Sequence, residues 1–195
     1  RILFFNDIYQ KFLNVNGVVM EFGTQWGQNL ALLSCLRGIY EPYNFTRRVI
    51  GFDTFEGLTE PDPEKDTPSE VSRKGNYGVT RGYENRLDAI LASHNQNAPN
   101  AQIKKYEVVK GDVRRTLGTY LSEHPETIVA FAYFDLDLYE PTRHCLKTIL
   151  PHLTKGSILA FDELNCPDFP GETRALREVM GTPLVVRARH CWVCC

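Results

Sequence analysis

The chain alternates between short apolar, β-rich runs and longer segments with helical spacing, and this alternation constrains the fold most strongly. The expected strands are residues 17–22, 48–53, 105–110, 128–134, 157–161 and 183–186. The expected helices are residues 4–13, 28–36, 84–93, 113–123, 141–150 and 172–180, with Gly38 as the stop of the second. Strands that alternate with helices predict an α/β fold, and their near-continuous apolar character predicts burial on both faces. We therefore expect a Rossmann-like, doubly wound, mostly parallel sheet of six or seven strands with helices on both faces.

A length of 195 residues is typical of one domain, so we expect residues 1–195 to form a single domain. The chain begins at Arg1 rather than at Met, and we expect the natural start to lie upstream. Little sequence beyond residue 190 remains for a last strand, so we expect either a truncated C-terminal edge or a short last strand.

The first expected helix carries aromatic and aliphatic residues on one face. Their spacing of three to four positions fits an amphipathic helix, and the residues are Phe4, Phe5, Ile8 and Phe12. This face packs either on the chain's own sheet or against a second copy in a homodimer. Packing within the chain is the favoured interpretation.

Residues 56–82 interrupt the alternation of strands and helices because they show no apolar period. The segment begins acidic and proline-rich and ends basic and glycine-rich. A long irregular loop inside a domain is usually either functional or disordered. We weigh two interpretations: a solvated insertion, or a lid that orders over a substrate and shapes its acceptor pocket.

Charge and composition exclude several classes of partner. Lys and Arg number 22 against 24 Asp and Glu, for a net charge of −2, and a nucleic-acid binder needs a basic excess. No apolar run approaches the roughly 20 residues of a membrane span. The 6 cysteines are too sparse for a disulfide framework, and the single Cys-x-x-Cys at Cys191 and Cys194 is short of a four-ligand zinc site. We expect a reducing, cytoplasmic setting without nucleic-acid or membrane partners.

Polar residues follow the expected strands where ligands bind in open α/β sheets. Gly23 permits a sharp turn, and Gly27 would let a helix begin close to a carboxylate or phosphate, although a tight turn without a ligand would look the same. Asp53 ends the second strand and can accept hydrogen bonds from a ribose. It lies 30 positions after Gly23 (53 − 23), more than the roughly 20 of dinucleotide folds. Gly111 and Asp112 end the third strand and could face an adenine.

Four carboxylates follow the fourth and fifth strands, namely Asp135, Asp137, Asp162 and Glu163. Like charges at short range raise one another's pKa, so gathering them without a cation is unfavourable. Oxygen ligands suit Mg²⁺, which would neutralise the group. The alternative is that some of these residues cap helices.

The motifs at these strand ends resemble the macrocin O-methyltransferase family of class I S-adenosylmethionine-dependent methyltransferases. The most specific are Gly-Phe-Asp-Thr-Phe-Glu-Gly-Leu at residues 51–58 and Asp-Leu-Asp-Leu-Tyr-Glu at residues 135–140. Lys-Gly-Asp at residues 110–112 and Asp-Glu-Leu at residues 162–164 also match, in the same order along the chain.

The resemblance implies an enzyme that uses S-adenosylmethionine and Mg²⁺ to methylate a hydroxyl group of a small molecule such as a sugar or secondary metabolite. The implied cofactor-binding residues are Glu21, Gly23, Thr24, Gly27, Asp53, Thr54, Phe55, Gly111, Asp112 and Asp135. The implied metal ligands are Asp135, Asp162 and Glu163, with Asp137 either a fourth ligand or a structural acid.

We assign the general base to Asp135, whose carboxylate would take the proton of the acceptor hydroxyl. The acceptor pocket would be shaped by residues 56–82 and by residues after Asp162, including Asn165, Asp168 and Glu172. Two alternatives remain. One is a nicotinamide-dependent oxidoreductase, for which the chain has no G-x-G-x-x-G. The other is a non-catalytic S-adenosylmethionine-binding or scaffold domain.

Overall fold

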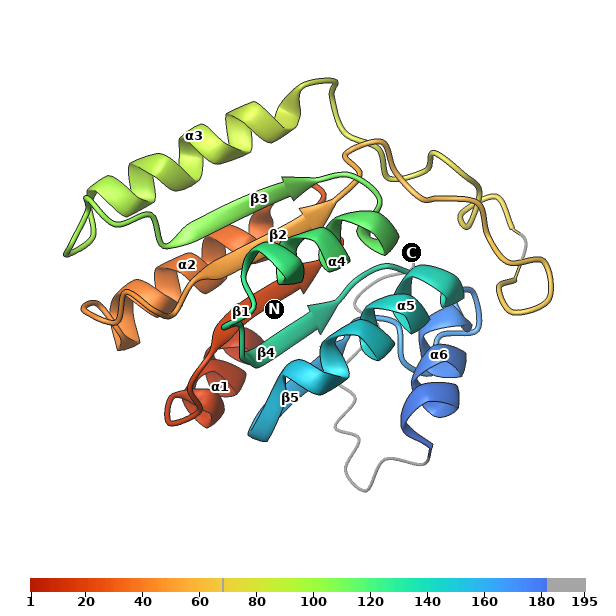
Figure 1. Ribbon diagram of the computed structural model, residues 1–195. Helices are drawn as coiled ribbons and strands as arrows, with labels where there is room; N and C mark the ends of the chain where they lie inside the picture. The colour runs from red at the N-terminus through yellow and green to blue at the C-terminus, as the bar shows by residue number, and fades with distance from the viewer. Residues whose placement is uncertain (68, 182–195) are drawn as a thin grey trace.

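The sheet is parallel throughout the part of the chain that the computed structural model describes, residues 1–67 and 69–181 (Figure 1). The strand order is β3-β2-β1-β4-β5. The strands are β1 (Val18–Phe22), β2 (Val49–Asp53), β3 (Tyr106–Lys110), β4 (Val129–Phe134) and β5 (Leu153–Phe161). The predicted α/β fold and parallel sheet are therefore confirmed. The expected strand 183–186 and the Cys-x-x-Cys lie outside the described residues, so six or seven strands stays a prediction.

Helices cover both faces of the sheet, as the alternation predicts. They are α1 (Ile2–Phe12), α2 (Gln28–Tyr40), α3 (Tyr83–Gln96), α4 (Val113–Glu123), α5 (Tyr139–Ile149) and α6 (Gly171–Met180), with a short 3-10 helix, η1 (Leu150–His152), after α5. One buried cluster joins the sheet to α1, α2 and α3, and a second joins it to α4, α5 and α6. Within the described residues no helix has the length and apolar character needed to cross a bilayer.

The prediction that Gly38 stops the second helix is wrong. Helix α2 continues through Gly38 to Tyr40. The buried Arg37 holds the end of the helix instead, because its guanidinium donates to the carbonyl oxygen of Asn44 at 2.8 Å and the N–H of Glu41 donates to the Arg37 carbonyl. Contacts beyond the helix thus outweigh the local tendency of glycine to end it.

Helix α1 packs on the chain's own sheet, as favoured above. The Phe12 ring stacks on Phe131 with centroids 5.1 Å apart, and Phe5 packs edge-on against Tyr133 at 4.9 Å. Phe5 and Phe12 are fully buried, whereas Phe4 is only partly so. The helix therefore seals one face of the sheet without a second copy of the chain.

Strand register brings the carboxyl ends of the central strands to one edge. Phe22 of β1 pairs with Phe134 of β4, which in turn pairs with Phe161 of β5. The next residues continue this alignment, since the N–H of Asp135 donates to the Phe22 carbonyl at 2.8 Å and that of Asp162 to the Phe134 carbonyl at 2.9 Å. Asp135 and Asp162, which are distant in sequence, therefore follow the ends of neighbouring strands at the same edge of the sheet.

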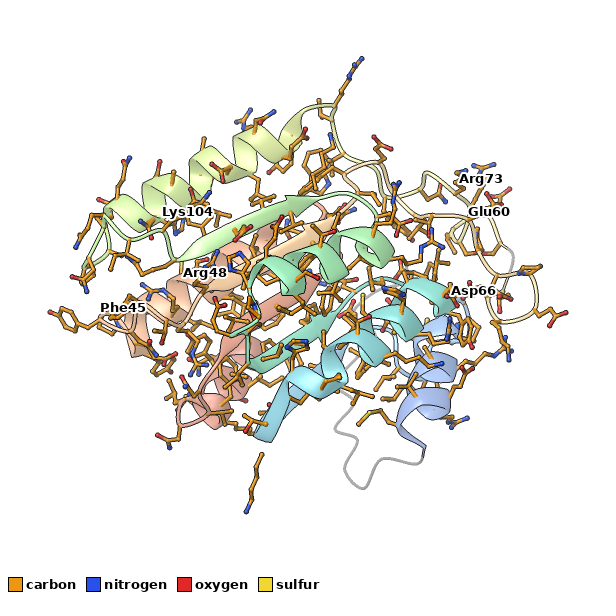
Figure 2. All side chains as sticks on the ribbon, viewed as in Figure 1. Phe45, Arg48, Glu60, Asp66, Arg73 and Lys104 are labelled. Carbon is orange, nitrogen blue, oxygen red and sulfur yellow. The ribbon has the colours of Figure 1, made fainter. Side chains whose placement is uncertain are left out.

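The 56–82 loop contains no helix or strand among its described residues and lies beyond this edge (Figure 1). Glu60 and Arg73 reach away from the sheet, while Asp66 lies closer to α5 and α6 (Figure 2). The N–H of Leu58 donates to the Asn76 carbonyl at 2.8 Å, and that of Gly75 donates to the Leu58 carbonyl at 2.9 Å. These bonds close the loop on itself next to the end of β2.

Candidate active site

A cavity of about 380 Å³ lies at the carboxyl ends of the strands. Six of the residues expected to bind a cofactor line it, namely Gly23, Asp53, Thr54, Gly111, Asp112 and Asp135. The three expected metal ligands, Asp135, Asp162 and Glu163, line it as well. Four expected cofactor residues do not, namely Glu21, Thr24, Gly27 and Phe55. The structure thus brings most of the predicted site together around one cavity.

The two glycines after β1 are required by protein packing. A β-carbon on Gly23, which has φ 90°, would lie 1.8 Å from the carbonyl oxygen of Asp135, so only glycine lets the turn cross the end of β4. A β-carbon on Gly27, with φ 74°, would lie 2.2 Å from Leu87 of α3. Gly27 therefore makes room for the Leu87 side chain of a neighbouring helix, and its expected close approach to a ligand stays a prediction.

Asp53 joins two turns at the cavity wall. Its Oδ2 accepts a hydrogen bond from the N–H of Gln25 at 2.7 Å, and its Oδ1 accepts one from the N–H of Phe55 at 2.5 Å. Burial raises the pKa of Asp53, and these backbone donors oppose the rise. A carboxylate has about four lone-pair positions, so Asp53 retains capacity for ligand hydroxyls. The Phe55 side chain itself lies in the hydrophobic core.

Asp112 differs from the other acids because a cation neutralises it. Its carboxylate accepts the N–H of Arg114 at 3.0 Å, which caps α4, and it also pairs with the Arg114 guanidinium. The hydrogen bonds from Arg114 hold the pKa of Asp112 below its ordinary value. Asp112 therefore fixes the start of α4 at the end of the cavity where an adenine was expected.

Two buried polar side chains near the end of β1 have no hydrogen bond of good geometry among the described residues, although the Asn29 side chain lies near enough to Glu21 to oppose the rise in its pKa. They are both carboxyl oxygens of Glu21, which is fully buried, and the hydroxyl of Thr24. Burial raises the pKa of Glu21 well above its ordinary value. Buried polar atoms are normally satisfied, so a pair left open beside a cavity fits a ligand that brings its own donors, such as an ammonium group.

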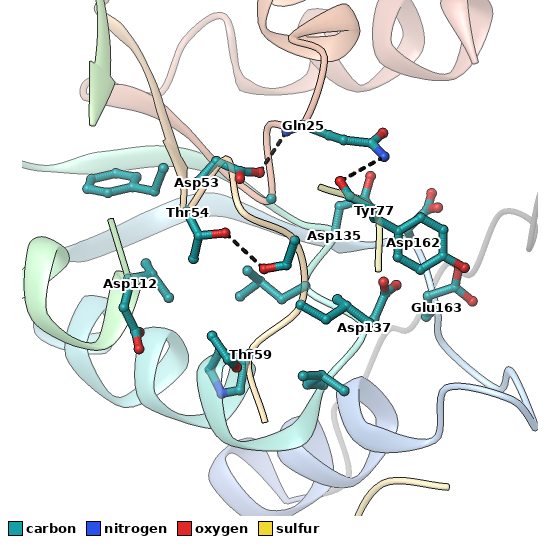
Figure 3. A pocket seen from close by; sticks show the side chains of 18 of the residues that line it. Gln25, Asp53, Thr54, Thr59, Tyr77, Asp112, Asp135, Asp137, Asp162 and Glu163 are labelled. Atoms are coloured by element: carbon teal, nitrogen blue, oxygen red, sulfur yellow. Dashed lines mark hydrogen bonds between the residues drawn. The ribbon is translucent and has the colours of Figure 1, made fainter. Parts of the chain in front are cut away.

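Asp137, Asp162 and Glu163 gather at the end of the cavity opposite Asp112, and Asp135 lies between (Figure 3). Burial, followed by the charges of Asp162 and Asp137, raises the pKa of Asp135 well above its ordinary value. Burial and Glu163 together raise the pKa of Asp137 to about 7. We call these four residues the acidic rim.

Two observations bear on whether the acidic rim could hold a metal. Among residues 1–67 and 69–181, no group of three or more His, Cys, Asp or Glu side chains converges as a ligand cluster. One carboxylate of the rim, Asp162, already accepts a hydrogen bond from the Tyr133 hydroxyl and has Arg1 at 3.9 Å. The donor set is nonetheless all carboxylate oxygen, which suits a hard divalent cation in chemistry and charge.

Helix capping does not explain Asp137. Helix α5 begins at Tyr139 after Leu138, and its cap carries no side-chain hydrogen bond. The Tyr139 N–H instead donates to Asp66, at 2.8 Å from Oδ1. Asp137 has φ 62°, a left-handed conformation that is uncommon for a residue with a β-carbon and is frequent at functional sites.

Glu172 has a role that the sequence did not suggest. It was expected near the acceptor, but it is fully buried and does not line the cavity. Its Oε1 accepts the N–H of Leu136 and its Oε2 accepts the N–H of Glu163, both at 3.0 Å. Burial, with Asp137 and Asp162 nearby, raises its pKa to about 8. Glu172 thus ties the segment after β4 to the segment after β5.

A sequence signal for the burial of Glu172 existed. It shares a helical face with Ala175 and Leu176, both of which are buried. Its two backbone partners, however, could be identified only from the tertiary structure.

An open parallel sheet with a polar cavity at the carboxyl ends of its strands defines an α/β protein of the nucleotide-cofactor type. The calicheamicin methyltransferase CalS11 has a crystal structure 44% identical to this chain, with a TM-score of 0.89 over 92% of this chain and 70% of that one. A second, apo structure of CalS11, described as a TDP-rhamnose 3′-O-methyltransferase, is 43% identical with a TM-score of 0.80 over 93% and 70%. The chain belongs to this family of S-adenosylmethionine-dependent methyltransferases.

A more distant structure, the O-methyltransferase NovP, shares the fold at 19% identity, with a TM-score of 0.66 over 93% of this chain and 72% of that one. No protein-family model matches the chain, and no curated protein does. Membership of the methyltransferases sets aside the oxidoreductase and the non-catalytic scaffold.

Proposed function

We propose that this protein transfers the methyl group of S-adenosylmethionine to a hydroxyl group of a sugar or a related natural product, as the macrocin O-methyltransferases do. The observation that carries the proposal is that Asp53 and the four carboxylates of the acidic rim line one cavity. CalS11, described as a TDP-rhamnose 3′-O-methyltransferase, makes a deoxysugar the first acceptor to test.

The cofactor would bind across the ends of β1, β2 and β3. When bound, S-adenosylmethionine supplies a methyl carbon already activated by its sulfonium. The open lone pairs of Asp53 would accept the ribose hydroxyls, and the unpartnered polar atoms of Glu21 and Thr24 fit its ammonium end. Gly111 and Asp112 would border the adenine. Gly23, Gly27, Thr54 and Phe55 shape the turns that hold these groups.

The task of the chain is to align the acceptor oxygen with the methyl carbon, since positioning alone can supply roughly 7–11 kcal/mol of the barrier in good cases. The Asp135 carboxylate would take the hydroxyl proton while the oxygen–carbon bond forms and the carbon–sulfur bond breaks. Asp135 lies between the Asp53 side of the cavity and the other acids of the rim, which is where the acceptor hydroxyl would meet the methyl group (Figure 3). The 56–82 loop would cover the acceptor during this step.

Mg²⁺ belongs to the proposal as the ion that Asp135, Asp162 and Glu163 would hold, with Asp137 either a fourth ligand or a structural acid. Such an ion would neutralise the acidic rim and lower the pKa of the acceptor hydroxyl. A homodimer and a cytoplasmic location also remain expectations.

Isothermal titration calorimetry tests the proposal. The ligands are S-adenosylmethionine, S-adenosylhomocysteine and NAD, each with and without Mg²⁺. Binding of both sulfur ligands and not of NAD is the expected result, followed by methylation of TDP-rhamnose in a turnover assay. A protein that binds neither sulfur ligand would overturn the proposal, and full turnover after chelation of divalent ions would remove Mg²⁺ from it.

A further inference from the structure

The cavity has two chemically different ends. Asp53 and Asp112 lie towards one end, whereas Tyr77 lies at the other, beside Asp162 and Glu163 (Figure 3). Tyr77 comes from the 56–82 loop, is 46% exposed and lines the cavity. An aromatic ring and a group of carboxylates thus line the same cavity, and Figure 3 shows them towards the end away from Asp112.

The backbone around Tyr77 is held in place from the β2 side. A β-carbon on Gly57 would lie 2.3 Å from the Asn76 carbonyl oxygen, so the chain just before Tyr77 passes directly over Gly57. The Asn76 carbonyl accepts the N–H of Leu58 at 2.8 Å. The Asn76 side chain also donates to the carbonyl oxygen of Val71 at 2.9 Å. These contacts fix the point from which the Tyr77 side chain projects.

Two further segments hold Tyr77 in position. The Gln25 side chain, from the turn after β1, donates to the Tyr77 carbonyl at 3.3 Å. The Phe169 ring, from the segment between β5 and α6, lies 6.4 Å from the Tyr77 ring at 58° and also lines the cavity. Phe169 itself is only 3% exposed, so it is a fixed support.

Tyr77 has φ 61° and Gln25 has φ 47°, both in the left-handed region. Residues with a β-carbon seldom adopt this region, and such strain persists mainly at functional sites. Burial of the ring does not explain the strain, because the ring stays nearly half exposed. The conformation presents an aromatic surface to the cavity.

We propose that Tyr77, supported by Phe169, forms an aromatic wall that binds the saturated ring of a sugar acceptor beside the acidic rim. This inference rests on the proposed methyl transfer. A sugar presents apolar C–H groups on its ring face and hydroxyls at its edge. Tyrosine offers a large apolar face with little conformational entropy to lose. Carboxylates of the rim accept the edge hydroxyls.

The chief rival is a contact between the Tyr77 ring and the sulfonium of the cofactor, which is a cation–π interaction. The two assignments differ in measurable ways. If the ring binds the acceptor, its removal weakens binding of the acceptor alone. If the ring contacts the sulfonium, its removal weakens binding of S-adenosylmethionine but not of S-adenosylhomocysteine, whose sulfur is neutral.

The test compares wild type, Tyr77→Ala and Tyr77→Phe with TDP-rhamnose as the acceptor. Tyr77→Ala is expected to raise the KM for TDP-rhamnose at least tenfold, with the Kd of both sulfur ligands within about twofold of wild type. Tyr77→Phe keeps the ring face, so its KM for TDP-rhamnose is expected to stay within about threefold of the wild-type value. Tyr43→Ala removes a 73% exposed tyrosine after α2 and is the matched control, expected to behave as wild type.

Each contrary outcome identifies what has failed. If the KM of Tyr77→Ala for TDP-rhamnose is unchanged, Tyr77 does not bind the acceptor and the proposal is refuted. A selective loss of affinity for S-adenosylmethionine in Tyr77→Ala also refutes it. The sugar assignment is refuted if the wild-type protein binds S-adenosylhomocysteine and methylates catechol, but methylates neither TDP-rhamnose nor methyl rhamnoside. Wild-type protein that binds no sulfur ligand overturns the proposed function itself.

Discussion

Individual carboxylates around the cavity have different chemistry because their surroundings differ. Arg114 neutralises Asp112 and lowers its pKa, so Asp112 is a fixed anion. Asp135 has no such cation, and burial with like charges raises its pKa. Groups of one residue type whose pKa values are driven apart in this way mark the assignment of acid and base roles.

Replacing Asp135 by Asn tests its role as the base. Asn keeps the size of the side chain but accepts no proton at neutral pH, so kcat is expected to fall by about 10²–10⁴-fold. The Kd of S-adenosylhomocysteine is expected to change less than tenfold. Steady-state kinetics and calorimetry provide both values.

The matched control is Asp88→Asn, at a surface carboxylate that pairs with Lys104 and does not line the cavity. It is expected to leave kcat unchanged. An Asp135→Asn protein with wild-type kcat would refute the assignment of the base.

At the scale of elements, Arg47 joins α1, β1 and the segment before β2. Its guanidinium bonds Glu41 at 2.8 Å and donates to the carbonyl oxygens of Gly17 at 2.5 Å and Val15 at 2.8 Å. It also lies 5.4 Å from the ring of Phe12, and the side chain is only 2% exposed. One buried cation therefore satisfies several groups from separate segments.

Arg47→Met is expected to lower the free energy of unfolding by about 3–5 kcal/mol, since it leaves a largely buried Glu41 carboxylate without its ion-pair partner. Urea denaturation measures the change. The control is Lys104→Met, in an exposed ion pair with Asp88, where about 0.5 kcal/mol or less is expected.

The same pair gives a dependence on pH. Burial alone would raise the pKa of Glu41, but hydrogen bonds from Arg47 and Asn44 bring it below its ordinary value. A lowered folded pKa stabilises the protein above the unfolded pKa of about 4.3, and this stabilisation disappears as the pH falls through the folded value. The difference between wild type and Arg47→Met should therefore shrink below about pH 4; a constant difference would contradict the pairing.

Asp66 links the 56–82 loop to the start of α5. Its Oδ1 accepts the N–H of Tyr139 at 2.8 Å, across 73 positions of sequence, and its Oδ2 accepts the N–H of Asp62 at 2.8 Å. It caps the helix from outside, next to Asp137 of the acidic rim. The loop is therefore fastened to the helix that follows β4.

Asp66→Ala is expected to lower the free energy of unfolding by about 1–2 kcal/mol, because it removes a helix cap. Proteolysis by trypsin at Lys65, Arg73 or Lys74 should also accelerate as the loop detaches. Glu60→Ala is the control, since Glu60 and Lys74 form an exposed pair in the same loop. Equal cleavage rates in both variants would show that Asp66 does not hold the loop.

At the scale of the whole molecule, one sheet carries two cores. Phe131 of β4 packs in the cluster with α1, whereas Phe134 of the same strand packs in the cluster with α4, α5 and α6. Both side chains are fully buried. Alternate residues of a strand point to opposite faces, so β4 couples the two cores into one unit.

Phe131→Ala is expected to cost about 3–5 kcal/mol, because it opens a cavity where Phe5 and Phe12 now pack. Circular dichroism and tryptophan fluorescence should report a single, coincident unfolding transition. Phe45→Ala, at a 53% exposed ring, is expected to change stability by less than about 0.5 kcal/mol. A separate early transition for α1 would contradict the coupling.

The presence of β1 to β5, most helix limits and the strand-end acids could be predicted from the sequence because their signals are local, although β5 begins at Leu153 rather than at residue 157. Helix α4 matches its predicted bounds, Val113–Glu123, and β1 differs by one residue. The structure places Asp53, Asp135 and Asp162 around one cavity, as their positions after strands indicate. The carboxyl ends of parallel strands lie at one edge of the sheet, so a residue that directly follows a strand is expected at that edge.

Other features could not be predicted because they depend on contacts between distant segments. Glu172 reaches Leu136 across 36 positions, and the Gln25 side chain reaches Tyr77 across 52. A local pattern contains no information about such pairs. The limit of α2 was missed for the same reason, because Arg37 outweighs Gly38 through contacts beyond the helix.

The sequence by itself determined the α/β fold, the order of its elements and the acids at the strand ends, since hydrophobic periodicity acts over a few residues. Only the tertiary structure decided which acids are paired with a cation, as Asp112 is with Arg114, and which have a pKa raised by burial, as Asp135 and Glu172 do. It also decided that Gly27 makes room for Leu87, that Glu172 fastens two strand ends and that Tyr77 lines the same cavity as the acidic rim. Burial and partner geometry govern these properties, and both arise only when distant segments pack together.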